Sequence, residues 1–168
     1  MTLTRLFPLG APIVDPTPGE ADVSAVMTPL YAPPAGPWVR INLISSVNGS
    51  ATGSDGTSNT LTSRTDRAVL KVIRSSSDVV VVGAATVRAE GYSMPRGARL
   101  AVITSTGELG GHRLAMPAGT EPLLVLCPRA AVAAARRSVA DLPIDIIVLP
   151  DDNGRIDLAE AIDAFGAR

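Results

Sequence analysis

The sequence predicts an α/β domain with a largely parallel sheet and helices on its faces. Short apolar runs alternate with stretches suited to helices along most of the chain. One of these runs, residues 79–82, consists of consecutive valines, which is typical of a strand buried on both faces. The composition is 46% hydrophobic and 18% charged over 168 residues, as expected of a globular protein with a sizeable core.

The first 37 residues differ from the rest of the chain. Residues 1–37 are rich in Pro, Ala and Gly, and we expect an irregular arm with a short helix around residues 20–28. Pro33, Pro34 and Pro37 close this arm, because each proline removes a backbone donor and restricts the residue before it. The folded domain is expected to span residues 38–168.

From Trp38 onward, strands and helices are expected to alternate. Strands are predicted at the apolar runs, residues 39–44, 79–82, 100–104, 123–127 and 144–149. Helices are predicted between and after them, at residues 65–76, 86–90, 130–140 and 158–165. Residues 49–59 are crowded with Gly, Ser, Thr and Asp and are predicted to form a polar loop.

Bulk properties exclude several classes of function. A formal charge of −1 gives no electrostatic case for a nucleic-acid partner. Cys127 and His112 are single residues of their types, so we expect no internal disulfide and no metal site. Prolines interrupt the N-terminal stretch, and no apolar run reaches membrane-spanning length. We therefore expect a cytoplasmic protein that acts on a small molecule and contacts no membrane.

The first candidate site is the junction of a valine run with a glycine, at residues 79–86. Gly83 lacks a Cβ, so a ligand or another backbone can approach it closely. Free N–H groups at the start of the following helix, with the Thr86 hydroxyl, can bind a phosphate or an amide. The alternative is an ordinary strand-to-helix turn in which Thr86 caps its own helix.

The second candidate lies where the predicted strand 39–44 ends. Ser46, Asn48 and Gly49 follow it, and ligands of open α/β sheets gather beyond the carboxyl ends of strands. Asn42 is unusual inside an apolar strand, since a buried amide needs hydrogen-bond partners. The alternative for Asn48 and Gly49 is a plain turn.

Two further candidates carry the same ambiguity. Asp66 lies at the end of the apolar face of a predicted helix, where its carboxylate could bind a pyrimidine edge or deliver a proton. Alternatively, Ser63 and Asp66 form a helix cap. Thr104 ends the predicted strand 100–104, and Ser105 and Thr106 follow it. These hydroxyls can hold a ribose or its 2′-phosphate beside an arginine such as Arg88, or they can simply build the turn.

Taken together, these segments resemble a known family. SSVNG at residues 45–49, DGTS at 55–58, TDR at 65–67 and VVVGAATVRAEGY at 80–92 occur in the order found in the pyrimidine reductase domain of the bifunctional riboflavin-biosynthesis deaminase/reductase. The chain is more similar still to the stand-alone pyrimidine-reductase-like proteins of actinobacteria. The motifs cover residues 38–106, and beyond them only the order of strands and helices matches.

The resemblance implies a dihydrofolate-reductase-like, three-layer α/β fold, which would act as a homodimer. It implies hydride transfer from NADPH to a 5-amino-6-(5-phosphoribosylamino)uracil-type substrate, opening the ribose to its ribitol form. The cofactor's nicotinamide and ribose would be bound by Gly83, Ala84, Thr86 and Val87, and its adenosine end by Thr104 and Ser105. The substrate side would be lined by Asn42, Ser46, Asn48, Gly49 and Asp66, with Asn48 and Asp66 as the candidate catalytic residues.

The chain departs from the family pattern in two ways. Asn48 stands where the family motif usually has Asp, which removes a charge from the substrate side. The family's Gly-Gly loop, which cradles the cofactor's pyrophosphate after a later strand, is not found, and Gly110-Gly111 does not follow a strand-to-helix turn. We therefore expect a sheet without the C-terminal strands, unpaired edges at residues 79–82 and 144–149, and weak activity of this chain alone.

Two other functions fit the same residues. A dihydrofolate-type reductase would present similar groups to a pterin, and turnover assays separate it from a riboflavin-type enzyme. A nucleotide-binding module without catalysis would explain Asn48 and the absent loop, since a fold does not fix a function. If the resemblance were accidental, only a parallel α/β domain would be left.

Overall fold

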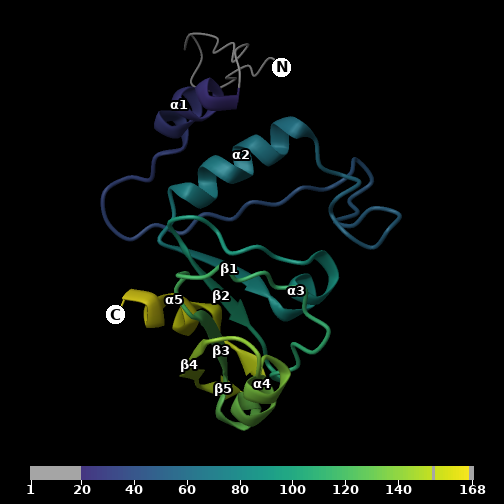
Figure 1. The fold of residues 1–168 in the computed structure, drawn as a ribbon, viewed down its shortest axis with the longest axis vertical. Helices are drawn as coiled ribbons and strands as arrows, with labels where there is room; N and C mark the ends of the chain where they lie inside the picture. The colour runs from purple at the N-terminus through teal and green to yellow at the C-terminus, as the bar shows by residue number, and fades with distance from the viewer. Residues whose placement is uncertain (1–19, 153, 167–168) are drawn as a thin grey trace. The chain divides into compact units, whose positions relative to one another are not determined.

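The computed structural model describes residues 20–152 and 154–166, and the chain divides into two units, Met1–Ser76 and Ser77–Arg168. The first unit contains two described helices, α1 (Glu20–Tyr31) and α2 (Arg64–Ser75), which contact each other (Figure 1). Both contribute buried apolar side chains, Met27 from α1 and Val72 and Ile73 from α2. The predicted short helix of the arm is confirmed, and it extends farther than expected.

The segment between α1 and α2 is irregular, so the predicted strand at residues 39–44 is wrong. Its alternating apolar side chains suit a strand, but a strand is stable only when a neighbour satisfies its peptide groups. Residues 39–44 have no such neighbour in the described part of the chain, and Ile41 and Leu43 are 89% and 78% exposed. Asn42 is also exposed, so the expected burial of its amide is wrong as well.

The second unit is built on a four-stranded parallel sheet in the order β1-β2-β3-β4. The strands are β1 (Val79–Gly83), β2 (Arg99–Ile103), β3 (Leu123–Pro128) and β4 (Ile144–Leu149). All four were predicted, with ends displaced by one residue at most. Each strand pairs with the next one along the chain, so the strand ends appear along the edge in sequence order.

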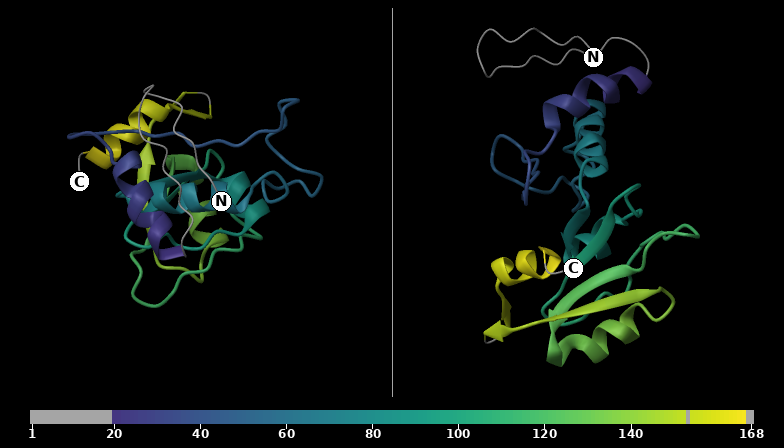
Figure 2. Two further views of the ribbon diagram at one scale, coloured as in Figure 1. Left: turned by 90° about the horizontal axis from the view of Figure 1, so that it is seen from above. Right: turned by 90° about the vertical axis from the view of Figure 1, so that its left-hand side faces the viewer.

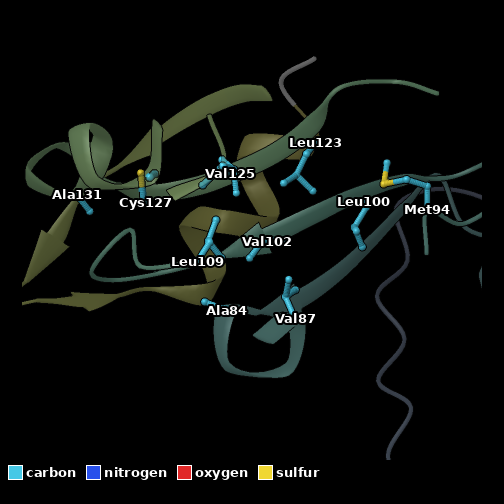
Figure 3. Close-up of a cluster of buried hydrophobic side chains, with 12 residues drawn as sticks. Ala84, Val87, Met94, Leu100, Val102, Leu109, Leu123, Val125, Cys127 and Ala131 are labelled. Atoms are coloured by element: carbon cyan, nitrogen blue, oxygen red, sulfur yellow. The ribbon is translucent and has the colours of Figure 1, made fainter. Parts of the chain in front are cut away.

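Helices cover both faces of this sheet and make three layers (Figure 2). The helices are α3 (Ala84–Glu90), the 3-10 turn η1 (Arg129–Ala131) with α4 (Val132–Ser138), and α5 (Leu158–Gly166). On one face, α3 buries Val87 near Val102 and Val125 of the sheet (Figure 3), and α4 adds Ala135 to the same cluster. On the other face, α5 buries Ala161 with residues of β2, β3 and β4.

One of the two interior strands of the sheet, β3, is buried throughout. All of its residues are buried, because alternate side chains enter the two apolar clusters on opposite faces. By contrast, β1 and β4 form the two edges of the sheet, as predicted, with Val81 and Val148 45% and 41% exposed.

A short antiparallel hairpin follows β4 and was not predicted. Its strands are β5 (Asp151–Asp152) and β6 (Arg155–Ile156), and Gly154 between them has a φ of +80°. Glycine suits the positive φ of this turn, but strands this short carry no periodicity in the sequence. None of the helices described is long and apolar enough to cross a membrane.

Candidate active site

The carboxyl ends of β1, β2 and β3 lie side by side and gather most of the predicted cofactor residues. In the strand register, Gly83 is level with Ile103, and Ile103 is level with Leu126. The Thr104 N–H continues the ladder by donating to the Leu126 carbonyl at 3.0 Å. Residues that follow the three strands therefore share one edge of the sheet, the position at which open α/β sheets bind ligands. We call this row of strand ends the carboxyl edge.

Gly83 leaves open space on the carboxyl edge. Its φ of −80° and ψ of 152° are values that any residue adopts. A Cβ added at Gly83 would meet nothing within 4 Å. Neither the backbone conformation nor packing against the described residues thus requires glycine here, whereas a ligand lying on the backbone would.

The first turn of α3 continues from Gly83. Fewer of its side chains are accessible to a ligand than the sequence predicted. Val87 is fully buried in the apolar cluster and Ala84 is nearly so, so their side chains face the core and Val87 leaves no exposed surface for a ligand (Figure 3). Thr86 is half-buried. Gly83, at the N-cap position, supplies no side-chain cap to this turn.

The turn after β2 is closed by its own hydrogen bonds. The Gly107 N–H donates to the buried Thr104 hydroxyl at 3.0 Å, and the Ser138 hydroxyl donates to the Gly107 carbonyl at 2.8 Å. Gly107 has a φ of +78°, and an added Cβ would lie 2.4 Å from the Ala131 carbonyl oxygen. The turn-building alternative therefore describes Thr104 correctly, and the turn is held against η1 and α4.

Ser105 is the hydroxyl of this turn that stays open. It is exposed and has no hydrogen-bond partner among the described residues, while the Thr106 hydroxyl accepts from the Glu108 N–H. Arg88, the arginine expected to assist here, does reach the loop after β2, but its guanidinium donates to the Glu108 carbonyl. Arg129 directly follows β3 on the same edge and was missed, although the rule that selects polar residues after strand ends would have found it.

Ser46, Asn48 and Gly49 form a compact turn in the first unit. The Ser46 hydroxyl donates to the Asn48 Oδ1 atom at 2.5 Å and accepts from the Ser50 N–H at 3.0 Å. Gly49 has a φ of +86°, and its N–H donates to the Ser46 carbonyl. The plain-turn alternative is thus confirmed for Asn48 and Gly49, whether or not the turn also lines a site.

The DGTS motif forms a second turn in the same segment. The Asp55 carboxylate accepts hydrogen bonds from the Thr57 N–H at 3.0 Å and from the Thr57 hydroxyl at 2.8 Å. These bonds stabilise the ionised form and lower the pKa of Asp55 below its ordinary value. The motif thus builds local structure.

Asp66 lies in the first turn of α2, and the predicted cap is present. The Asp66 N–H donates to the Ser63 hydroxyl at 3.1 Å, and the Asp66 Oδ2 atom accepts from the Thr62 hydroxyl at 2.5 Å. The carboxylate is half-buried and keeps acceptor capacity beyond this single bond. Among the described residues, no hydrogen bond joins Asp66 to residues 42–49. These substrate-side candidates all belong to the first unit, whereas the cofactor-side candidates belong to the second.

A cavity of about 790 Å³ lies at the opposite edge of the sheet, among residues that precede β1, β2 and β3. It is lined by Asp78, Met94, Arg96 and Glu121, among others. This amino edge is not where parallel sheets collect ligands, so we place the site at the carboxyl edge despite the size of the cavity. No cluster of three or more His, Cys, Asp or Glu residues that could hold a metal ion occurs within 20–152 and 154–166.

Comparison with known families identifies the family to which the chain belongs. The model of one family, described as the RibD C-terminal domain, matches residues 37–168. The chain belongs to the RibD C-terminal domain family. The predicted relationship to riboflavin-pathway pyrimidine reductases is confirmed, and so is the dihydrofolate-reductase-like fold class of this RibD-type domain. A search of curated proteins found no match to the chain.

Proposed function

We propose that the protein is an NADPH-dependent reductase of a 5-amino-6-(5-phosphoribosylamino)uracil-type substrate in riboflavin biosynthesis. When bound, NADPH supplies a hydride to C1′ of the ribose. The bond from C1′ to the ring oxygen breaks, that oxygen takes one proton, and the products are the open ribitol chain and NADP⁺. Because the cofactor carries the redox chemistry, the protein has to bind the cofactor and the substrate, orient them toward each other, and deliver a proton.

Gly83 is the observation that carries this proposal. It is a glycine that neither the backbone conformation nor the packing of the chain requires, and it lies on the edge where α/β sheets bind nucleotides. A nicotinamide lying flat over the Gly83 backbone would occupy the space that a Cβ would fill. The residues present therefore fit the cofactor that the family implies.

The order of strand ends supports a direction for the cofactor. Gly83, Ala84 and Thr86 follow β1 and would hold the nicotinamide and its ribose. Thr104 and Ser105 follow β2 and would hold the adenosine end, Thr104 by shaping the turn and Ser105 by its exposed hydroxyl. Neighbouring strands are about 5 Å apart, so an extended dinucleotide can cross from one strand end to the next.

Asp66 is the better candidate for proton delivery on the substrate side. A carboxyl group can carry and release a proton, whereas the Asn48 amide can only orient a ring through hydrogen bonds. We assign Asn42, Ser46, Asn48 and Gly49 to substrate binding. Asp66→Asn keeps the size of the side chain and should lower kcat roughly 100-fold or more, with NADPH affinity unchanged. If D66N folds normally and turns over like the wild type, Asp66 is only a helix cap.

The test of the function is a binding and turnover experiment on the full chain. NADPH binding is measured by fluorescence, and oxidation of NADPH is then followed with the ribosylaminopyrimidine phosphate and, separately, with dihydrofolate. We expect saturable binding and faster turnover of the pyrimidine. Preference for dihydrofolate would indicate a pterin reductase, and absence of NADPH binding would contradict the proposed function.

Binding without turnover would identify a nucleotide-binding module. One observation favours this second candidate: the Asn48 Oδ1 atom already accepts from the Ser46 hydroxyl, so this side chain is partly satisfied inside its own turn. Soaking NADPH into crystals would locate the bound cofactor for either candidate. Density beside Gly83 and Thr86 supports the assignment, and density elsewhere contradicts it.

We also propose that the protein is a homodimer. The two edge strands of the sheet expose Val81 and Val148, and unpaired edges favour association. Light scattering during size-exclusion chromatography should give twice the mass of the chain, and a monomer at all concentrations would contradict the proposal.

A further inference from the structure

Asn48 is followed directly by a glycine in a turn at the surface of the first unit. The Gly49 N–H donates to the Ser46 carbonyl at 2.9 Å, and this bond closes the turn. Asn48 and Gly49 are both exposed, and a Cβ added at Gly49 would meet nothing within 4 Å. Solvent therefore reaches the peptide bond that joins these two residues.

The side-chain amide of Asn48 is held through its oxygen. The Ser46 hydroxyl donates to the Asn48 Oδ1 atom at 2.5 Å, and the Nδ2 group makes no hydrogen bond to any described residue. A donor at Oδ1 draws electron density from Cγ and stabilises the negative charge that forms on the oxygen when Cγ is attacked. The amide is thus activated at its carbonyl carbon, and its nitrogen is free to leave.

The nucleophile for such an attack is the peptide nitrogen of Gly49. It follows Asn48 in the chain, and glycine hinders the approach least because it has no Cβ. The hydrogen bond from this N–H to Ser46 has to open first. A single bond in an exposed turn opens far more often than a packed element does, so this step does not require unfolding.

We propose that Asn48 is a site of spontaneous modification, at which the side-chain amide is converted into a carboxylate. The Gly49 nitrogen bonds to Cγ of Asn48 and gives up its proton, and Nδ2 takes that proton and leaves as ammonia. Water then opens the resulting cyclic imide: addition at Cγ gives an aspartate, and addition at the backbone carbonyl gives an isoaspartate. Overall, one water is consumed and one ammonia is released, and no oxidant or reductant takes part.

The turn can accommodate the aspartate product. A carboxylate at position 48 accepts the same hydrogen bond from the Ser46 hydroxyl, and more strongly, because it is charged. It also brings to the substrate side a group that can transfer a proton, which an amide cannot do. This consequence for turnover rests on the proposed function, whereas the modification itself does not.

Two other asparagines provide controls within the same chain. Asn42 and Asn59 are exposed as well, but they precede a leucine and a threonine, whose side chains hinder attack by the peptide nitrogen. All three asparagines lie on one tryptic peptide, residues 41–64, so a single fragmentation spectrum compares them. Asn153 also precedes a glycine but lies outside the described residues, and a different tryptic peptide reports on it.

The experiment incubates the folded full chain at mildly alkaline pH and follows, by peptide mass spectrometry, the mass gain that accompanies loss of an amide. Asn48 should be converted roughly tenfold or more faster than Asn42 and Asn59. Gly49→Ala should slow this conversion roughly tenfold, because the added methyl group hinders the nitrogen. Gly36→Ala is the matched control, because Gly36 has a φ of +94° against +86° for Gly49 and also has open space around it, so both variants carry similar backbone strain.

Each outcome bears on the proposal. Fast conversion at position 48 that G49A slows and G36A leaves unchanged supports it. Equal rates at the three asparagines, or the same slowing in both variants, overturns it. So does an intact Asn48 over a period in which the free peptide of residues 41–64 is converted, since the folded turn would then protect the amide. Circular dichroism spectra verify that each variant is folded.

These measurements are independent of cofactor binding. A chain that binds no NADPH contradicts the proposed function, yet the mass gain at Asn48 is still measured in the same way. Failure of the modification and failure of the proposed function are therefore distinguished.

Discussion

Gly83 and Gly107 follow neighbouring strands of one sheet, yet they are glycines for different reasons. Gly107 has a positive φ and its α-carbon lies against the backbone of η1 and α4, so the fold itself excludes a side chain. Gly83 has an ordinary φ and empty space around it. The difference separates a glycine needed for folding from one that only a ligand would require, and the following predictions test this separation.

The largest effect is expected at Gly107. Gly107→Ala combines a left-handed backbone conformation with overlap against the Ala131 carbonyl oxygen, and should lower the free energy of unfolding by about 2–5 kcal/mol. Urea unfolding measures this loss. Gly110→Ala is the control, because Gly110 has no positive φ and an added Cβ meets nothing within 4 Å, so its stability should stay near that of the wild type. Equal midpoints for both variants would contradict the assignment.

A smaller effect is expected from the hydrogen bond that closes the same turn. Thr104→Val keeps the shape of the buried side chain but leaves the buried Gly107 N–H without its 3.0 Å acceptor. The cost should be about 1–3 kcal/mol of unfolding free energy. Thr104→Ser retains the hydroxyl and should recover much of this loss; if it does not, packing of the methyl group matters more than the hydrogen bond.

Gly83→Ala should give the reverse pattern. Its unfolding free energy is expected to stay within about 0.5 kcal/mol of the wild type, because the added methyl meets open space. NADPH binding should weaken by about 1–3 kcal/mol, since the methyl would overlap the bound cofactor. Calorimetry and urea unfolding of one preparation give both values. A G83A variant that is destabilised but binds normally would remove the distinction between the two glycines.

The smallest effect on stability is expected from Cys127, a buried residue of β3. Burial raises the pKa of this thiol above its ordinary value of 9.0. The folded state thus holds the thiol proton more tightly than the unfolded state, so this contribution to stability is complete below about pH 9 and decreases as the pH rises further. Unfolding midpoints from pH 7 to 10 should show a decrease in the wild type that Cys127→Val lacks. Rapid alkylation of the native thiol would contradict its burial.

Much of the second unit could be predicted because its strands are recognisable alone. The valine run of β1 and the apolar run of β3 each mark a strand, although the predicted burial on both faces is wrong for β1, which lies at the edge of the sheet. The strand predicted at residues 39–44 is wrong, because an alternating apolar pattern indicates a strand but does not show whether a neighbouring strand exists to pair with it. The hairpin at residues 151–156 was not predicted, because its strands are only two residues long and show no pattern in the sequence.

The site was predictable in position but not in detail. Polar and small residues after strand ends identified Gly83, Thr104 and Ser105 correctly as neighbours on one edge. Which of them is open depends on contacts remote in sequence, such as that of Gly107 with Ala131, and no local pattern reveals these. Arg129, which directly follows β3 on the same edge, was missed although the same rule would have selected it.

The burial of β3 has a consequence for the lifetime of the site. Hydrogen-bonded partners on both sides and apolar clusters on both faces surround this strand, so we expect its amide protons to exchange with solvent mainly when the whole unit unfolds. The edge strands can separate in smaller and more frequent openings. Residues at the end of β3 would therefore be anchored to the part of this unit that opens last, while Gly83 at the end of β1 would lie on a part that fluctuates earlier.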